Sequence, residues 1–180
     1  MQLFKIKNII VTLLIGFTFS QKLLVPMDQS QTDHLKAYGI AFWTLKKGQE
    51  VDWLLNYRGG SFIINFDKIL ERELKIRGVY YESINASTLT NIFAQIENNN
   101  MDMVLLEKLP KIAVYSPPNK QPWDDAVTLA LTYSEIDYEV IFDEEVLTDK
   151  LSEYDWLHLH HEDFTGQYGK FYKNYHNATW

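Results

Sequence analysis

Short apolar runs alternate with segments of helical period along most of this chain, and this alternation strongly limits the folds that it can adopt. The expected strands are 22–26, 51–57, 79–84, 111–115, 138–142 and 155–159, with 103–106 as a short strand or connector; the expected helices are 33–47, 66–77, 87–98, 124–134 and 144–151. Strand–helix–strand units of this kind favour an α/β fold. We therefore expect a doubly wound, mainly parallel sheet of the flavodoxin-like or Rossmann-like type. We expect this sheet to be incomplete at the carboxyl terminus, because no further strand follows the aromatic segment 167–175.

Composition and charge exclude several classes of function. The chain has 180 residues, of which 46% are hydrophobic and 23% charged, as in a globular α/β protein. Its formal net charge of −7 argues against a nucleic-acid partner, because neutralising phosphates requires a basic surface. The chain contains no cysteine, which excludes disulfides, thiolate metal sites and cysteine nucleophiles within it.

The first twenty residues have the pattern of an export signal. Lys5 and Lys7 precede an apolar stretch at 9–19, which is short for a membrane span. We expect a signal peptide at 1–20, cleaved after Ser20, and a periplasmic or secreted product that is not held in a membrane. The alternative is an uncleaved membrane anchor.

A histidine-rich segment at the end of the last expected strand is a candidate metal site. His158 and His160 share one face of a strand, so both could bind one zinc ion together with Asp163, while Glu162 acts as general base. The alternative is that His158 packs within the sheet and that His161, Glu162 and Asp163 organise the following turn. Under this alternative the protein needs no cofactor.

Polar residues also follow two other expected strands. Asp143 and His160 each follow an expected strand, and in a parallel sheet they would lie at the same edge, where Asp143, His160, His161 and Glu162 are candidates for acid–base catalysis. Ser116 ends a third strand and is a candidate ligand-binding residue. A Ser116–His160–Asp143 triad is a further alternative, although no G-x-S-x-G motif supports it. Asp143 also suits the N-cap of the next helix.

Arg58, Gly59, Gly60 and Ser61 follow the second expected strand and are candidate ligand-binding residues. Backbone N–H groups of a glycine-rich turn, together with a guanidinium, can hold an anion. The alternative is a tight turn with no ligand. Neither of the glycine-rich nucleotide-binding motifs occurs in the chain.

Three stretches of the chain resemble a known family. They are LVPMDQSQTDHLKAYGIAFWTL at 24–45, WLLNYRGGSF at 53–62 and DWLHLHHEDFTGQYGKFY at 155–172. They are similar to an exported bacterial family commonly labelled asparagine synthetase B, whose members are longer than this chain. From Lys111 onward the chain also resembles class I glutamine amidotransferase-like domains, which implies a flavodoxin-like sheet.

The activity in the family label requires residues that this chain lacks. Glutamine-dependent asparagine synthesis of that class uses an amino-terminal cysteine and an S-G-G-x-D-S loop, and neither occurs here. We therefore expect an amino-terminal α/β unit at 21–109 and an amidotransferase-like unit at 110–180, which together bind a small polar ligand or a protein partner without cysteine catalysis. The alternative is a metal-assisted hydrolase that uses His158, His160 and Asp163. Whether the protein is an enzyme, and its oligomeric state, are left open by the sequence.

Overall fold

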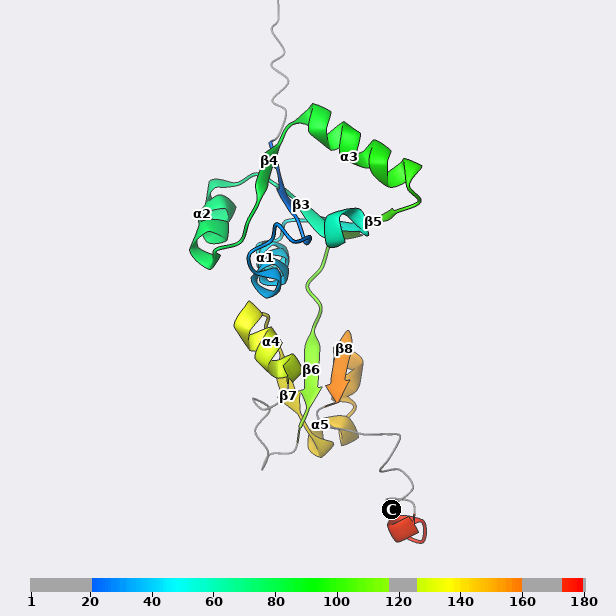
Figure 1. Cartoon of the computed structure of the whole chain (residues 1–180). Helices are drawn as coiled ribbons and strands as arrows, with labels where there is room; N and C mark the ends of the chain where they lie inside the picture. Colours follow the sequence, from blue (N-terminus) through cyan, green and yellow to red (C-terminus); the bar gives the residue numbers. More distant parts are fainter. Residues whose placement is uncertain (1–20, 117–125, 160–172, 180) are drawn as a thin grey trace, which may run out of the picture.

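The computed structural model describes residues 21–116, 126–159 and 173–179, which form an α/β structure with two separate sheets (Figure 1). The expected signal peptide at 1–20 lies outside these ranges. None of the helices within them is long and apolar enough to cross a membrane.

The first sheet is antiparallel. Its strands are β1 (Lys22–Val25), β2 (Val51–Leu55), β3 (Ser61–Asn65), β4 (Glu82–Ile84) and β5 (Asp102–Leu106). They lie in the order β4-β1-β3-β2-β5, and each neighbouring pair is antiparallel. The expectation of a mainly parallel sheet is therefore wrong for this half of the chain. Strands β1 to β4 instead have the split β-α-β arrangement of a ferredoxin-like fold.

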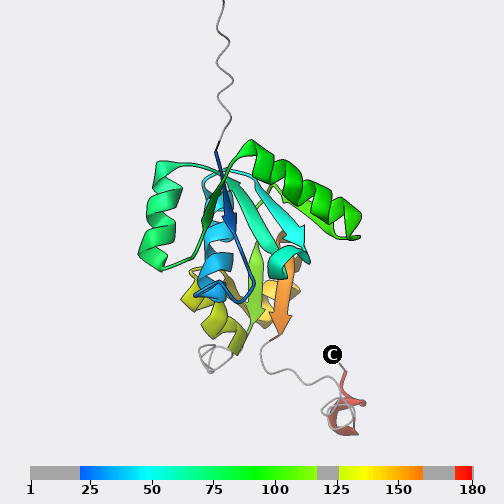
Figure 2. The ribbon, with the colours of Figure 1, turned by 45° about the horizontal axis from the view of Figure 1, so that its top comes forward.

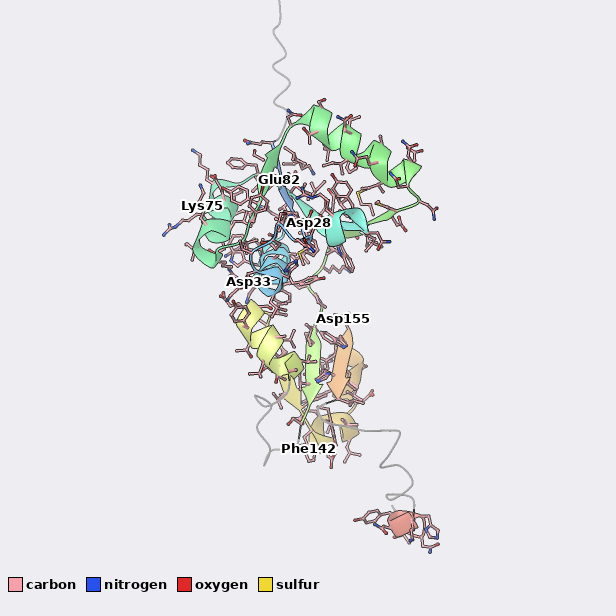
Figure 3. The ribbon with its side chains drawn as sticks, viewed as in Figure 1. Asp28, Asp33, Lys75, Glu82, Phe142 and Asp155 are labelled. Atoms are coloured by element: carbon pink, nitrogen blue, oxygen red, sulfur yellow. The ribbon has the colours of Figure 1, made fainter. Side chains whose placement is uncertain are left out.

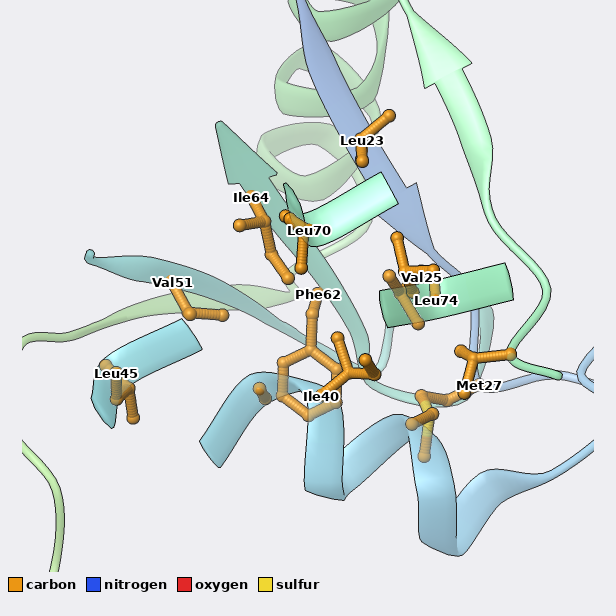
Figure 4. Packing of buried hydrophobic residues seen from close by; sticks show 13 residues of the cluster. Leu23, Val25, Met27, Ile40, Leu45, Val51, Phe62, Ile64, Leu70 and Leu74 are labelled. Carbon is orange, nitrogen blue, oxygen red and sulfur yellow. The ribbon is translucent and has the colours of Figure 1, made fainter. Parts of the chain in front are cut away.

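Both faces of the first sheet are covered by helices (Figure 2). Because side chains alternate along a strand, Leu23 and Val25 of β1 point to one face and Leu24 points to the other. The first face packs against α1 (His34–Lys46) and α2 (Lys68–Arg77), as Figure 4 shows. The second face packs against α3 (Ala86–Asn98).

Strand β3 is absent from the sequence prediction. It follows the 3-10 turn η1 (Tyr57–Gly59), and Phe62, Ile63 and Ile64 within it are almost fully buried. The hairpin between β2 and β3 depends on left-handed backbone at Asn56, Arg58, Gly59 and Gly60. A turn that reverses the chain in this way places β3 beside β2, so the segment 58–61 does not lead directly into a helix.

Helices α2 and α3 begin at other residues than the sequence predicts. The helix expected at 66–77 begins at Lys68, because Asn65 belongs to β3 and Asp67 is the N-cap, whose carboxylate accepts the N–H of Ile69. The helix expected at 87–98 begins at Ala86, with Asn85 as its N-cap. Both caps satisfy an N–H of the first turn that has no partner within the helix.

The second sheet is parallel, as expected for this part of the chain. Its strands are β6 (Ile112–Tyr115), β7 (Glu139–Ile141) and β8 (Trp156–Leu159), in the order β7-β6-β8. The chain returns to β7 through α4 (Ala126–Ser134), and to β8 through α5 (Asp143–Leu147) and the 3-10 turn η3 (Lys150–Glu153).

The two halves pack through α1 and α4. The Cα of Gly39 in α1 lies so close to α4 that an added Cβ would be 2.0 Å from the carbonyl oxygen of Ser134. Ion pairs surround this contact: Glu135 binds Lys36 and Arg77, each at 2.9 Å. The ion pair with Lys36, followed by the charge of Arg77, lowers the pKa of Glu135 although burial opposes the shift.

We expect Tyr154 to titrate at unusually high pH. Its hydroxyl donates a 2.6 Å hydrogen bond to Glu139 of β7, and this bond, with burial, raises the Tyr154 pKa to about 12. Because the folded-state pKa is raised, the bond stabilises the protein fully below pH about 10, the usual tyrosine pKa, and this contribution is lost as the pH rises through about 12. Ultraviolet difference titration of the protein against its Tyr154→Phe variant should show one phenol with a midpoint near pH 12. A midpoint near the usual value would contradict the Tyr154–Glu139 hydrogen bond.

Candidate functional site

The carboxyl ends of β6, β7 and β8 form one edge of the parallel sheet. The chain leaves β6, the central strand, for β7 on one side and later crosses to β8 on the other. In open α/β sheets, ligands bind at the carboxyl ends of the strands, near the point where the strand order reverses, which here lies between β6 and β8.

Tyr115 and Asp143 are joined at this edge. The hydroxyl of Tyr115, the last residue of β6, donates a 2.6 Å hydrogen bond to Oδ1 of Asp143, the first residue of α5. The Tyr115 ring also contacts the ring of Phe142, with 5.2 Å between their centroids. The Asp143 carboxylate is therefore held in place by the neighbouring strand. Asp143 is a candidate from the sequence, whereas Tyr115 is not, because their pairing depends on where β6 and α5 meet in space.

Asp143 is not the N-cap of α5, contrary to one of the sequence alternatives. Phe142 is the N-cap, and its N–H donates a 3.0 Å hydrogen bond to the carboxylate of Glu145. This hydrogen bond lowers the pKa of Glu145. Phe142 lies at the end of β7 in the lower half of the molecule (Figure 3). Because Glu145 takes the capping role, the carboxylate of Asp143 faces Tyr115 instead.

Ser116 lies at the same edge. It directly follows β6, is buried, and donates its N–H to the carbonyl oxygen of Ile141 in β7 at 3.0 Å. The structure thus places Ser116 and Asp143 at adjacent strand ends, as the parallel arrangement predicts.

The histidine-rich candidates lie mostly beyond the described ranges. His158 is on β8 opposite Val114 of β6 and is half-buried. His160, His161, Glu162 and Asp163 lie outside the described residues. Within 21–116, 126–159 and 173–179, no group of three or more His, Asp or Glu side chains is placed to hold a metal ion. The zinc site and the histidine-based catalytic groups therefore stay predictions.

Arg58 is held by carboxylates of its own half of the molecule. Its guanidinium donates to Asp28 at 2.6 Å, to Glu82 at 2.7 Å and to the hydroxyl of Ser30 at 3.1 Å. Figure 3 shows Asp28 and Glu82 together in the first half. The hydrogen bond with Arg58 holds the pKa of Asp28 far below its usual range, and the same bond raises the pKa of Arg58. These pairs give Arg58 a structural role, because an anionic ligand would have to compete with two carboxylates.

The rest of the Arg58–Ser61 turn also bonds within the protein. Ser61 is buried, and its hydroxyl donates to the carbonyl oxygen of Tyr57 at 3.0 Å. The carbonyl oxygen of Gly60 accepts the indole N–H of Trp53 at 3.1 Å. Ligand binding by Arg58, Gly59, Gly60 and Ser61 stays a prediction.

Comparison with known proteins found no match among protein-family models, curated proteins or solved structures. The resemblance to the family labelled asparagine synthetase B therefore stays a prediction, and the function must be argued from the residues themselves.

Proposed function

We propose that this chain is an exported, amidotransferase-like α/β protein with a flavodoxin-like second half, and that it binds a small polar ligand at the carboxyl edge of β7-β6-β8 without cysteine chemistry. The observation that carries the proposal is the Tyr115–Asp143 hydrogen bond, which fixes a carboxylate at the carboxyl edge of the parallel sheet, beside the central strand β6. A carboxylate fixed at that edge is a preorganised acceptor.

Asp143 supplies the main recognition group in this proposal. A carboxylate has acceptor capacity for about four hydrogen bonds, and Tyr115 occupies only one of these positions. Ligand ammonium or amide N–H groups would donate to the remaining positions. Tyr115 is a positioning residue, because it orients the carboxylate. Ser116 joins the ends of β6 and β7 through the hydrogen bond from its N–H to Ile141.

The proposal is tested by titrating the protein with L-glutamine and L-asparagine, which carry both ammonium and amide donors, under calorimetry. We expect saturable binding that weakens about tenfold or more in Asp143→Asn and less in Tyr115→Phe, since hydrogen bonds to charged groups contribute about 1.5–3 kcal/mol. Asp149→Asn is the matched control, because Asp149 is an exposed carboxylate of the same half whose left-handed backbone suits asparagine. Equal affinity in all three variants, or no binding of either amino acid, would contradict the proposal.

The second candidate function is a metal-assisted hydrolase. It is favoured by the place of His158 on β8, one residue before the end of the strand at Leu159, so that the segment bearing His160 and Asp163 starts at the same carboxyl edge. Elemental analysis of the purified protein separates the two functions, because only the hydrolase requires about one zinc ion per chain that is lost in His158→Ala.

A further inference from the structure

An apolar cleft lies between the two halves of the molecule. Its volume is about 580 Å³, within the range of about 300–1,000 Å³ that is usual for sites of small ligands. The first half contributes residues of α1, β2, β3 and β5, and the second half contributes residues of β6, α4 and β8. Clefts between packed units are a frequent location for ligand sites.

The wall of the cleft is rich in aromatic rings, which are Tyr38, Phe42, Trp53, Phe62 and Trp156. Trp53 is stacked on Phe62 with 6.2 Å between ring centroids and 26° between planes, and Tyr38 meets Phe62 edge-on at 5.6 Å. Tyr38 and Trp156 are 42% and 44% exposed, so these two rings offer open surface that nothing in the described chain covers. The cleft therefore suits a flat apolar ligand.

The polar edge of Trp53 is already satisfied within the protein. Its indole N–H donates to the carbonyl oxygen of Gly60 at 3.1 Å, so the ring meets the cleft with its apolar surface. A ligand can pack on this ring without leaving a donor unpaired.

Among the described residues that line the cleft, Lys108 is the one with a charged side chain. Lys108 is exposed and forms no ion pair with any residue of the described ranges. The neighbouring cation Lys111, by contrast, pairs with Glu153 at 3.6 Å. Among the described residues, an unpaired lysine beside an otherwise uncharged apolar cleft favours a ligand that carries one negative charge.

The cleft is separate from the carboxyl edge described above. Ile112 and Trp156, which line it, are the first residues of β6 and β8, whereas Tyr115 and Asp143 lie at the opposite ends of the strands. Binding in the cleft is therefore independent of the proposed function.

We propose that this cleft binds a small planar aromatic carboxylate, with the ring system among Tyr38, Trp53 and Trp156 and the carboxylate at Lys108. The volume indicates the size class of the ligand, the exposed rings favour a flat apolar body, and Lys108, the one cation among the described lining residues, favours a negative charge.

The test measures binding of 2-naphthoate and of its uncharged analogue 2-naphthamide by calorimetry. We expect one site per chain and an affinity for 2-naphthoate about tenfold higher than for the amide. In Lys108→Gln this preference should disappear, while the affinity for 2-naphthamide stays unchanged. Lys75→Gln is the control, because Lys75 is an exposed cation on α2 outside the cleft, and it should keep the preference.

A second variant tests the aromatic wall without depending on charge. Trp156→Ala removes a half-exposed ring, so the protein should stay folded by circular dichroism, and both ligands should bind about tenfold more weakly. Three results would overturn the proposal: no saturable binding of 2-naphthoate, a carboxylate preference that survives Lys108→Gln, or a dimer of this chain that excludes 2-naphthoate from the cleft.

Discussion

Replacing Gly39 with alanine should destabilise the protein by about 1–3 kcal/mol, the usual cost of overpacking. In an isolated helix the same change would stabilise by about 1 kcal/mol, because alanine is the better helix former. In the folded protein the change in stability is unfavourable instead, because the new Cβ would lie 2.0 Å from the carbonyl oxygen of Ser134. This oxygen belongs to the backbone and cannot rotate away as a side chain could. We expect α4 to move off α1 in Gly39→Ala, and urea denaturation of the variant measures the loss.

The coupling between Lys36 and Glu135 shows whether the two halves have moved apart. These side chains pair at 2.9 Å across the α1–α4 contact, so a double-mutant cycle should give a smaller coupling in the Gly39→Ala background. Gly48→Ala is the control, because Gly48 follows α1 in left-handed backbone with nothing within 4 Å of an added Cβ. It should lower stability through backbone strain and leave the coupling unchanged. If Gly39→Ala is as stable as the original protein, the close packing of α1 on α4 is wrong.

The sequence predicted most of the elements but not how the first half of the chain pairs its strands. Alternating strands and helices occur both in doubly wound sheets and in the split β-α-β arrangement observed here, so periodicity alone does not separate them. The deciding feature is the tight hairpin before β3. Two glycines followed by the apolar run Phe62–Ile64 are a hairpin signal, but Asn56 and Arg58 also adopt left-handed backbone, and these residue types do not reveal it by themselves.

The candidate site likewise combines features that the sequence predicts with features that depend on tertiary packing. The position of Ser116 and Asp143 at one edge could be predicted because each follows an apolar strand, and the parallel pairing in the second half brings these strand ends together. The Tyr115–Asp143 bond could not be predicted, since it depends on where β6 and α5 meet in space. The cleft could not be predicted either, because Trp53 and Trp156 come to line one cleft only when the two halves pack together.

Replacing Gly59 with alanine should destabilise the protein by about 2–5 kcal/mol, the sum of left-handed strain and a close contact. Gly59 has φ of +82°, and an added Cβ would lie 2.3 Å from the carbonyl oxygen of Met27. Met27 is buried in the core and donates its N–H to the carbonyl oxygen of Arg58 at 3.1 Å. The segment at Met27 and Asp28 must therefore move in Gly59→Ala, and urea denaturation measures the cost. Gly78→Ala is the matched control, because Gly78 has φ of +68° with open space around it, and it should show the strain alone.

The titration of Asp28 separates this local displacement from a general loss of stability. In the original protein the hydrogen bond from Arg58 holds the Asp28 pKa far below its usual value, so the carboxylate stabilises the fold above its unfolded pKa of about 3.9 and loses this contribution as the pH falls toward the folded pKa. If alanine at Gly59 pushes Asp28 away from Arg58, the carboxyl resonance of Asp28 in NMR should titrate closer to pH 4, whereas Gly78→Ala should leave it unchanged. A Gly59→Ala variant that loses stability but keeps the low Asp28 pKa would show that the turn relaxes without moving Asp28. In that case the Arg58–Asp28 pair is held by contacts other than the close approach of Gly59 to Met27.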